Sequence, residues 1–153
     1  MKDLKYVEFT QVVPDQFLDL LNGQRVREHL IQHDPFDAIS VKPWMEDKIA
    51  MNSCEGCKVR VIFDENTLIG WCGIQLEDKK FEIAIVIDDR HWGVGITVFK
   101  EIMRWAKEIG HDTIYIHLLK TRPEYRFLRK ISNKVFETEH FGRKFLTYQL
   151  SVS

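Results

Sequence analysis

The sequence predicts an α/β (α+β) domain in which a mixed, mostly antiparallel sheet is flanked by helices. Residues 58–89 are rich in Val, Ile, Phe and Trp and are interrupted twice by short polar runs, which is typical of three successive antiparallel strands. A helical pattern and another strand-like segment follow, which predicts a right-handed crossover between two parallel strands. Residues 134–152 alternate between apolar and polar side chains around Gly142, which predicts a C-terminal β-hairpin.

The first third of the chain is predicted to be helical and irregular. Pro14 is suited to the first turn of a helix and Gly23 to its end, whereas weak periodicity and two prolines indicate a loop further on. In order, we expect a strand over 3–10, a helix over 13–24, a short helix over 26–31, a loop over 33–43 and a helix over 44–52.

The crossover helix is predicted from Gly93 to Gly110. Apolar residues recur there at helical spacing, Lys and Glu occupy the other face, and Gly110 stands where a helix should stop. Residues 112–119 then read as a strand and residues 121–132 as a shorter helix. The expected inner face of the crossover helix consists of Ile96, Phe99, Met103, Ala106 and Ile109.

Length and charge limit the classes of function. The 153 residues fit one domain, which we expect to span residues 1–153, and the formal net charge of −1 implies no general attraction to nucleic acid or to anionic membranes. No apolar run approaches the roughly 20 residues of a membrane span, and the N-terminal segment lacks the apolar stretch of a signal peptide. We therefore expect a cytoplasmic protein that binds neither nucleic acid nor membrane.

The three cysteines are predicted to be reduced thiols. Cys54 and Cys57 form a CxxC sequence, which opens a zinc or redox alternative. A structural zinc site needs four ligands, however, and Cys72 is the only further cysteine. We expect a plain loop at this CxxC and no bound metal.

Gly93 and Gly95 stand between a predicted strand and the start of the crossover helix. Glycine is costly there by roughly 1 kcal/mol relative to alanine, so its presence needs a reason. A helix N-terminus offers unpaired N–H groups to an anion, and Arg90 could add a full positive charge. The alternative is a tight turn with close packing of helix against sheet. Neither the P-loop nor the Rossmann glycine pattern fits this sequence.

The run from Arg90 to Gly95 resembles the acetyl-CoA motif Q/R-x-x-G-x-G/A of the Gcn5-related N-acetyltransferase (GNAT) family, and it falls between the same two elements. The resemblance extends from about Lys58 to the C-terminus. It implies a GNAT fold, acetyl-CoA as cosubstrate, and a strand before the motif that bonds the pantetheine arm. The implied cofactor-binding residues are Ile85, Val86, Ile87, Arg90, His91, Trp92, Gly93, Val94, Gly95, Ile96 and Thr121.

The resemblance also implies a general base at Glu82, which lies on the strand before the motif. Glu82 is flanked by Phe81 and Ile83, and partial burial would raise the pKa of its carboxyl toward neutral pH, as suits a base. The alternative is a solvent-facing strand residue that alternates with a buried neighbour.

The segment 121–132 departs from the family pattern. Its alignment puts Thr121 at the usual asparagine and Leu128 at the usual tyrosine, so the family's general acid is missing. Tyr125 lies one helical turn earlier and could replace it, unless it only packs. His117 is a further acid-base candidate, with a half-buried structural histidine as the alternative.

The resemblance implies an acetyl-CoA-dependent N-acetyltransferase that acts on a primary amine, on a small molecule or an exposed protein amino group. We expect direct transfer, because none of the cysteines stands at an evident nucleophile position. The acceptor would lie against the N-terminal helices, roughly residues 22–45, and against the strand-end residues near Glu82. The protein would be a monomer or a homodimer. The last segment also resembles GNAT-like proteins of tailed bacteriophages. This second resemblance supplies a rival hypothesis, a non-catalytic GNAT-fold module that binds CoA or a protein.

Overall fold

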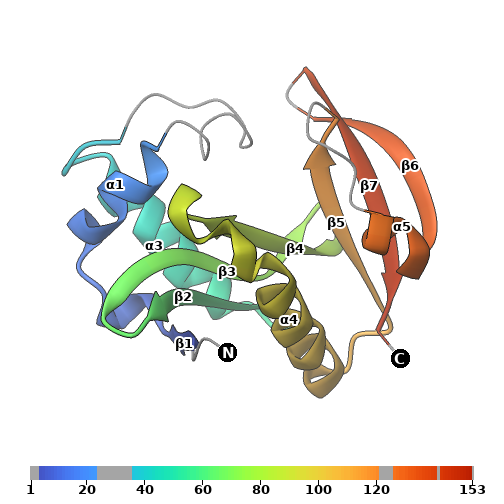
Figure 1. The fold of residues 1–153 in the computed structure, drawn as a ribbon, viewed down its shortest axis with the longest axis horizontal. Coiled ribbons are helices and arrows are strands. Elements are labelled where there is room, and N and C mark those ends of the chain that lie inside the picture. Colours follow the sequence, from blue (N-terminus) through green and yellow to red (C-terminus); the bar gives the residue numbers. More distant parts are fainter. Residues whose placement is uncertain (1–3, 24–35, 121–125, 141, 153) are drawn as a thin grey trace.

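The computed structural model describes residues 4–23, 36–120, 126–140 and 142–152. Within these residues a seven-stranded sheet runs in the order β1-β2-β3-β4-β5-β7-β6 (Figure 1). Only β4 and β5 are parallel, so the predicted mixed and mostly antiparallel sheet is confirmed. The strands are β1 (Leu4–Val7), β2 (Lys58–Asp64), β3 (Thr67–Glu77), β4 (Lys80–Ile87), β5 (Thr113–Leu119), β6 (Ser132–His140) and β7 (Arg143–Ser151).

The meander from β2 to β4 follows from its turn residues. Asp78 and Lys79 connect β3 to β4, and both adopt positive φ angles, as a two-residue type I′ turn requires. This turn sets a register in which Gln75 lies opposite Glu82 and Trp71 lies opposite Val86. The register therefore puts Gln75 beside Glu82 on one face of the sheet.

The parallel strands β4 and β5 separate along their length. Their ladder consists of Glu82 with Tyr115 and Ile83 with Ile116, although β4 runs on to Ile87. Beyond that point β4 stays paired with β3, and β5 stays paired with β7. Figure 1 shows the two strands diverging toward their carboxyl ends.

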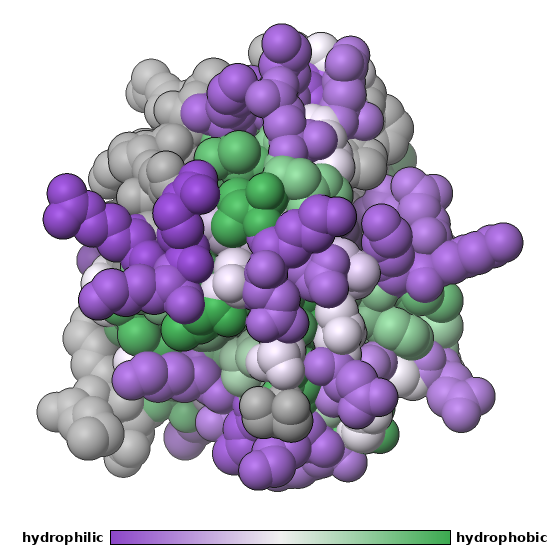
Figure 2. Space-filling model, turned by 90° about the vertical axis from the view of Figure 1, so that its right-hand side faces the viewer, coloured by the Kyte–Doolittle hydropathy of each residue, from purple (hydrophilic) through white to green (hydrophobic). Residues whose placement is uncertain are grey.

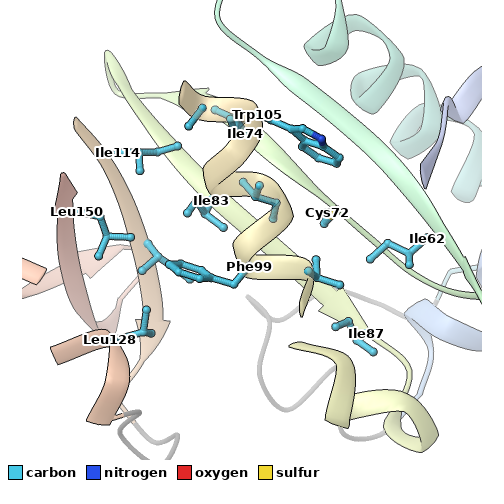
Figure 3. Close-up of a cluster of buried hydrophobic side chains, with 14 of the residues drawn as sticks. Ile62, Cys72, Ile74, Ile83, Ile87, Phe99, Trp105, Ile114, Leu128 and Leu150 are labelled. Atoms are coloured by element: carbon cyan, nitrogen blue, oxygen red, sulfur yellow. The ribbon is translucent and has the colours of Figure 1, made fainter. Parts of the chain in front are cut away.

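The crossover helix α4 (Gly95–Ile109) covers the sheet with a face that differs from the predicted one. Ile96 and Ile109 are 53% and 41% exposed, so the expected inner face was wrong at both ends. Compared with the predicted face, the buried apolar face is rotated about the helix axis to other residues, whose spacing follows the helical period equally well. Figure 3 shows two residues of this buried face, Phe99 and Trp105, in the core. The buried residues are Val98, Phe99, Ile102, Trp105 and Ala106.

The N-terminal elements pack on the opposite face of the sheet. Their apolar side chains join Val59, Val61, Trp71 and Val86 in a second core. The helix predicted over 44–52 begins at Val41 rather than at Trp44. The Asp37 carboxylate accepts hydrogen bonds from the backbone N–H groups of Ile39 and Ser40, which form the turn that leads into this helix. The elements are η1 (Phe9–Gln11), η2 (Pro14–Phe17), α1 (Leu18–Leu21) and α3 (Val41–Asn52); the predicted helix 26–31 lies outside the described residues.

The C-terminal hairpin of β6 and β7 is confirmed, and β7 inserts between β5 and β6. The short helix α5 (Arg126–Ile131) leads into it. Figure 2 shows the side of the molecule that carries these elements, where hydrophilic side chains surround smaller apolar patches. None of the helices in the described part of the chain combines the length and apolarity that crossing a membrane requires.

Candidate active site

The end of β4 leads into a helix N-terminus that no side chain caps. A 3-10 segment, η3 (Asp89–Val94), precedes α4, so the α-helix begins at Gly95 rather than at the predicted Gly93. Val94 is the N-cap residue, and its side chain cannot accept a hydrogen bond. The first turn of α4 also contains no acidic residue. The positive end of the helix dipole is therefore left for an external anion.

Gly93 and Gly95 are not explained by packing or by backbone geometry. A Cβ atom built on either residue would meet no atom of the described chain within 4 Å, and neither residue has a positive φ angle. Close packing of helix against sheet, the alternative considered from the sequence, is therefore wrong. That a ligand approaches this backbone from outside, the other reason considered from the sequence, stays a prediction.

The other residues of the motif surround this opening. Arg90 is largely exposed and pairs with Asp88 at 3.1 Å, and its hydrogen bonds hold the pKa of the Asp88 carboxyl below its usual value. His91 is half-buried between Asp64 and Asp88, each at 4.0 Å. Val94 is buried and Ile96 is exposed. Trp92 lies in η3, and its side chain lies outside the part of the chain that the structure describes.

The predicted pantetheine segment lies where β4 leaves β5. Val86 and Ile87 bury their side chains, and Ile85 is half-buried. What this stretch can offer a ligand is therefore its backbone, as a strand that accepts an added strand does.

A row of polar side chains crosses the sheet on the face opposite α4. Ile74, Ile83, Ile116 and Tyr148 point into the core under α4, so the residues that alternate with them point the other way. The polar residues that point away from α4, together with Thr138 of β6 and Lys48 of α3, are called the polar strip below. Its members are Lys48, Gln75, Glu82, His117, Thr147 and Thr138.

Glu82 is the central member of the polar strip. Its side chain is 15% exposed, so the solvent-facing alternative is wrong, and its Oε2 lies 3.2 Å from Nε2 of His117. Burial raises the pKa of the Glu82 carboxyl to about 8; Glu77 and Asp78 add to the rise, and the Lys48 ammonium opposes it. A carboxyl with this pKa can accept a proton near neutral pH.

Lys48 was not singled out from the sequence. It donates a hydrogen bond of 2.6 Å to Oε1 of Gln75 and lies 4.1 Å from the centre of the Trp71 ring. Burial lowers the pKa of its ammonium to about 8, against the opposing effect of Glu82. The sequence did not indicate that Lys48 is buried, because its burial depends on how α3 packs on β3.

Replacing Lys48 with methionine is expected to stabilise the protein by about 1–2 kcal/mol at pH 6. The folded state resists protonating this lysine, so wild-type stability is lowest below pH 8 and recovers as pH rises toward 10.5. The advantage of the variant should therefore shrink between pH 8 and pH 10.5. Thermal unfolding across this range measures it, with exposed Lys42→Met on the same helix as control. An advantage that grows with pH would contradict this assignment.

The family's tyrosine position cannot supply an acid in this chain. Leu128 occupies it, and its side chain is 2% exposed within the core under α4 (Figure 3). Tyr125, the candidate replacement, and Thr121, the remaining cofactor candidate, lie outside the described residues. Their roles stay predictions.

The fold and this site agree with the sequence comparison. The family described as Acetyltransferase (GNAT) domain matches residues 8–123, which is more than half of the chain. The chain belongs to the GNAT acetyltransferase family. GNAT acetyltransferases use acetyl-CoA, and the uncapped helix with its two glycines fits that cosubstrate. No curated protein is significantly similar to the chain in sequence, and the resemblance of the last segment to phage proteins stays a prediction.

Solved GNAT structures share the fold over the whole chain. A protein from Bordetella pertussis assigned to the GnaT acetyltransferase family has a TM-score of 0.79 at 12% identity, covering 99% of this chain and 98% of that one. An acetyltransferase from Salmonella typhimurium that modifies the N-terminal serine of 50S ribosomal subunit protein L7/L12 has a TM-score of 0.73 at 15% identity, covering 98% and 94%. The Salmonella typhimurium protein yncA, solved with its cofactor acetyl-CoA, has a TM-score of 0.67 at 11% identity, covering 100% and 95%.

Proposed function

We propose that this GNAT domain transfers an acetyl group from acetyl-CoA directly to a primary amine, on a small molecule or on an exposed protein amino group. The observation that carries the proposal is the end of β4, where an uncapped helix N-terminus meets two glycines whose missing side chains would face open space. These features favour a bound diphosphate. Glu82 lies on the same strand, beside the point where β4 and β5 separate.

The chain's own groups would hold acetyl-CoA along β4. The N–H groups at the start of α4 and the Arg90 guanidinium bind the pyrophosphate, and the backbone of Ile85 to Ile87 pairs with the pantetheine amides. Acetyl-CoA supplies an acetyl group already activated as a thioester. A backbone N–H of β4 near the separation would stabilise the charge that develops on the carbonyl oxygen.

Glu82 acts as the general base. An amine attacks only when neutral, so a proton must leave the acceptor's ammonium, and a Glu82 carboxylate oxygen receives it. Burial raises the pKa of the Glu82 carboxyl to about 8, which suits a general base that works near neutral pH. The departing thiolate needs a proton in turn, and Tyr125 is our candidate donor because Leu128 carries none.

Removal of the cysteines is expected to leave acetyl transfer intact. Burial raises the pKa of the Cys57 thiol to about 11 and that of Cys72 further, so neither forms a thiolate readily at neutral pH. The variant Cys54→Ser, Cys57→Ser, Cys72→Ala should keep kcat within about twofold of wild type. Intact mass after incubation with acetyl-CoA alone should show no acetyl adduct on a cysteine. A cysteine adduct that acceptor amine discharges would refute direct transfer.

The acceptor would lie on the α3 face, beside Lys48 and Glu82; of the predicted acceptor region 22–45, residues 24–35 lie outside the described residues. The Salmonella typhimurium acetyltransferase that modifies an N-terminal serine supports a protein amino group as one acceptor class for this chain. We further infer a cytoplasmic enzyme that consists of one domain over residues 1–153 and acts as a monomer or homodimer. Its near-neutral charge supports partners other than nucleic acid or membrane.

The proposed function is tested by measuring CoA thiol release from acetyl-CoA in the presence of an amine panel. The panel comprises spermidine, an aminoglycoside, free lysine and a peptide with an N-terminal serine, with the form of each in which every amine is acetylated as control. Release that needs a free amine, together with a product heavier by one acetyl group, supports the proposal. Binding of acetyl-CoA without release on any amine would favour the non-catalytic module.

A further inference from the structure

Glu82 begins a continuous series of hydrogen-bonding groups that runs across three further strands. Its Oε2 lies 3.2 Å from His117 Nε2 on β5, and His117 Nδ1 lies 2.7 Å from Thr147 Oγ1 on β7. Thr147 Oγ1 in turn lies 2.8 Å from Thr138 Oγ1 on β6. The series therefore joins the proposed base to the outermost strand of the sheet.

Each interior member of this series can both donate and accept a proton. An imidazole carries a nitrogen of each kind, and a hydroxyl donates one hydrogen while accepting another. Two arrangements are therefore possible. When Glu82 is ionised, His117 Nε2–H donates to it and Nδ1 accepts from Thr147. When Glu82 is protonated, it donates to Nε2, and Nδ1–H donates to the Thr147 oxygen.

Thr147 lies at a position where a hydroxyl needs a purpose. It is 1% exposed, and among the residues that the structure describes it is the only buried residue that is neither apolar, aromatic nor glycine. An apolar β-branched residue of the same shape would fit a buried strand at least as well. Thr138 is half-buried on β6, the outermost strand of the sheet. The series thus leads from a buried carboxyl toward water.

We propose that Glu82, His117, Thr147 and Thr138 form the exit path for the proton that the acceptor amine gives up. The path rests on the proposed function, since Glu82 must lose this proton before each new turnover. The Glu82 O–H proton moves to His117 Nε2, the Nδ1 proton to Thr147 Oγ1, the Thr147 hydroxyl proton to Thr138 Oγ1, and the Thr138 hydroxyl proton to water. Every bond to hydrogen that breaks is replaced by a new one. Rotation of the hydroxyls then resets Thr147 and Thr138. His117 regains its Nδ1–H form by exchange with water, which takes the proton from Nε2 and supplies one to Nδ1, so each bond to hydrogen that breaks is again replaced.

The hydroxyl of Thr147 can be removed with little change of shape. In Thr147→Val, steady-state kcat at pH 9 should fall about tenfold. The first turnover should keep its rate, because it uses a Glu82 that is already ionised. Thr147→Ser should restore kcat, and imidazole buffer should raise kcat of the valine variant in proportion to its concentration. Thr113→Val, on the same face of β5 but outside the path, is the matched control.

Two kinetic outcomes would overturn the exit path. One is a Thr147→Val enzyme with wild-type kcat and no response to imidazole. The other is an equal loss in the first turnover and in steady state, which would mean that Thr147 only positions His117. An enzyme that transfers no acetyl group in the wild-type form would instead refute the proposed function.

A readout that needs no turnover is the tautomer of His117, from ¹⁵N chemical shifts of histidine-labelled protein. The titratable groups facing Glu82 are Glu77 and Asp78 from the β3 side, Lys48 from α3, and His117 and Tyr115 from β5. Neutral His117 should change from Nδ1–H to Nε2–H as pH rises through the ionisation of Glu82. Thr147→Val should weaken this change. A single tautomer throughout the titration would refute the path even if transfer is observed.

Discussion

Replacing Gly93 with valine is expected to weaken acetyl-CoA binding about 100-fold, which corresponds to about 2.7 kcal/mol. The new side chain would project into the space from which the pyrophosphate approaches the N–H groups of α4. Stability should be unchanged or slightly higher, because the residue has no positive φ angle and the Cβ meets no atom within 4 Å. Calorimetric titration of the variant and thermal unfolding measure the two effects separately.

Gly110 offers the matched control for this prediction. It ends α4 with a φ angle of 106°, in the left-handed region that glycine tolerates best. Gly110→Ala should therefore lower stability by about 1 kcal/mol and leave acetyl-CoA affinity unchanged. If Gly93→Val bound acetyl-CoA as well as wild type, Gly93 would have no role in the cofactor site.

Replacing Glu82 with glutamine is expected to lower kcat by about 10²- to 10⁴-fold, with little change in acetyl-CoA affinity. The amide keeps the shape of the side chain but cannot take a proton from the ammonium. In the wild-type enzyme kcat/KM should rise with pH and level off above about 8, where Glu82 ionises. Steady-state kinetics from pH 6 to 10 measure this profile, which should flatten in the variant.

The stability of the same variant provides a control for folding. The folded state binds the Glu82 proton more tightly than the unfolded state, so wild-type stability declines as pH rises from about 4.5 through about 8. Glu82→Gln should therefore be more stable than wild type at pH 9 and closer to it at pH 5. A variant with full activity, or one that is less stable at pH 9, would contradict the buried base.

Much of the fold could be predicted from local patterns. Local rules that tertiary packing did not override explain three features of the fold. These features are the Asp78–Lys79 turn, the alternation along β2 to β4, and Gly110 at the end of α4. The inner face of α4 was predicted less well, since a helix with apolar residues at several phases has more than one plausible stripe. Packing against Ile83 and Ile114 selected Val98 and Ile102 over Ile96 and Ile109.

Only the part of the candidate site that is contiguous in sequence could be predicted. The run from Arg90 to Gly95 is contiguous, so its position at the end of a strand followed from the sequence. The contact between Glu82 and His117 depends on the register of two parallel strands joined by a helix, and the contact between His117 and Thr147 depends on β7 inserting beside β5. No local rule specifies either pairing. The sequence indicated Glu82 and His117 as separate acid-base candidates, and it gave no signal for Thr147.

The most direct test of a cofactor site at the end of β4 is calorimetric titration of the wild-type protein with acetyl-CoA, CoA and a pantetheine fragment that lacks the pyrophosphate. We expect acetyl-CoA and CoA to bind with micromolar affinity, and the fragment to bind at least about 100-fold more weakly. This result would place the main binding energy at the uncapped start of α4. Equal affinity for the fragment, or no binding of acetyl-CoA, would contradict the account.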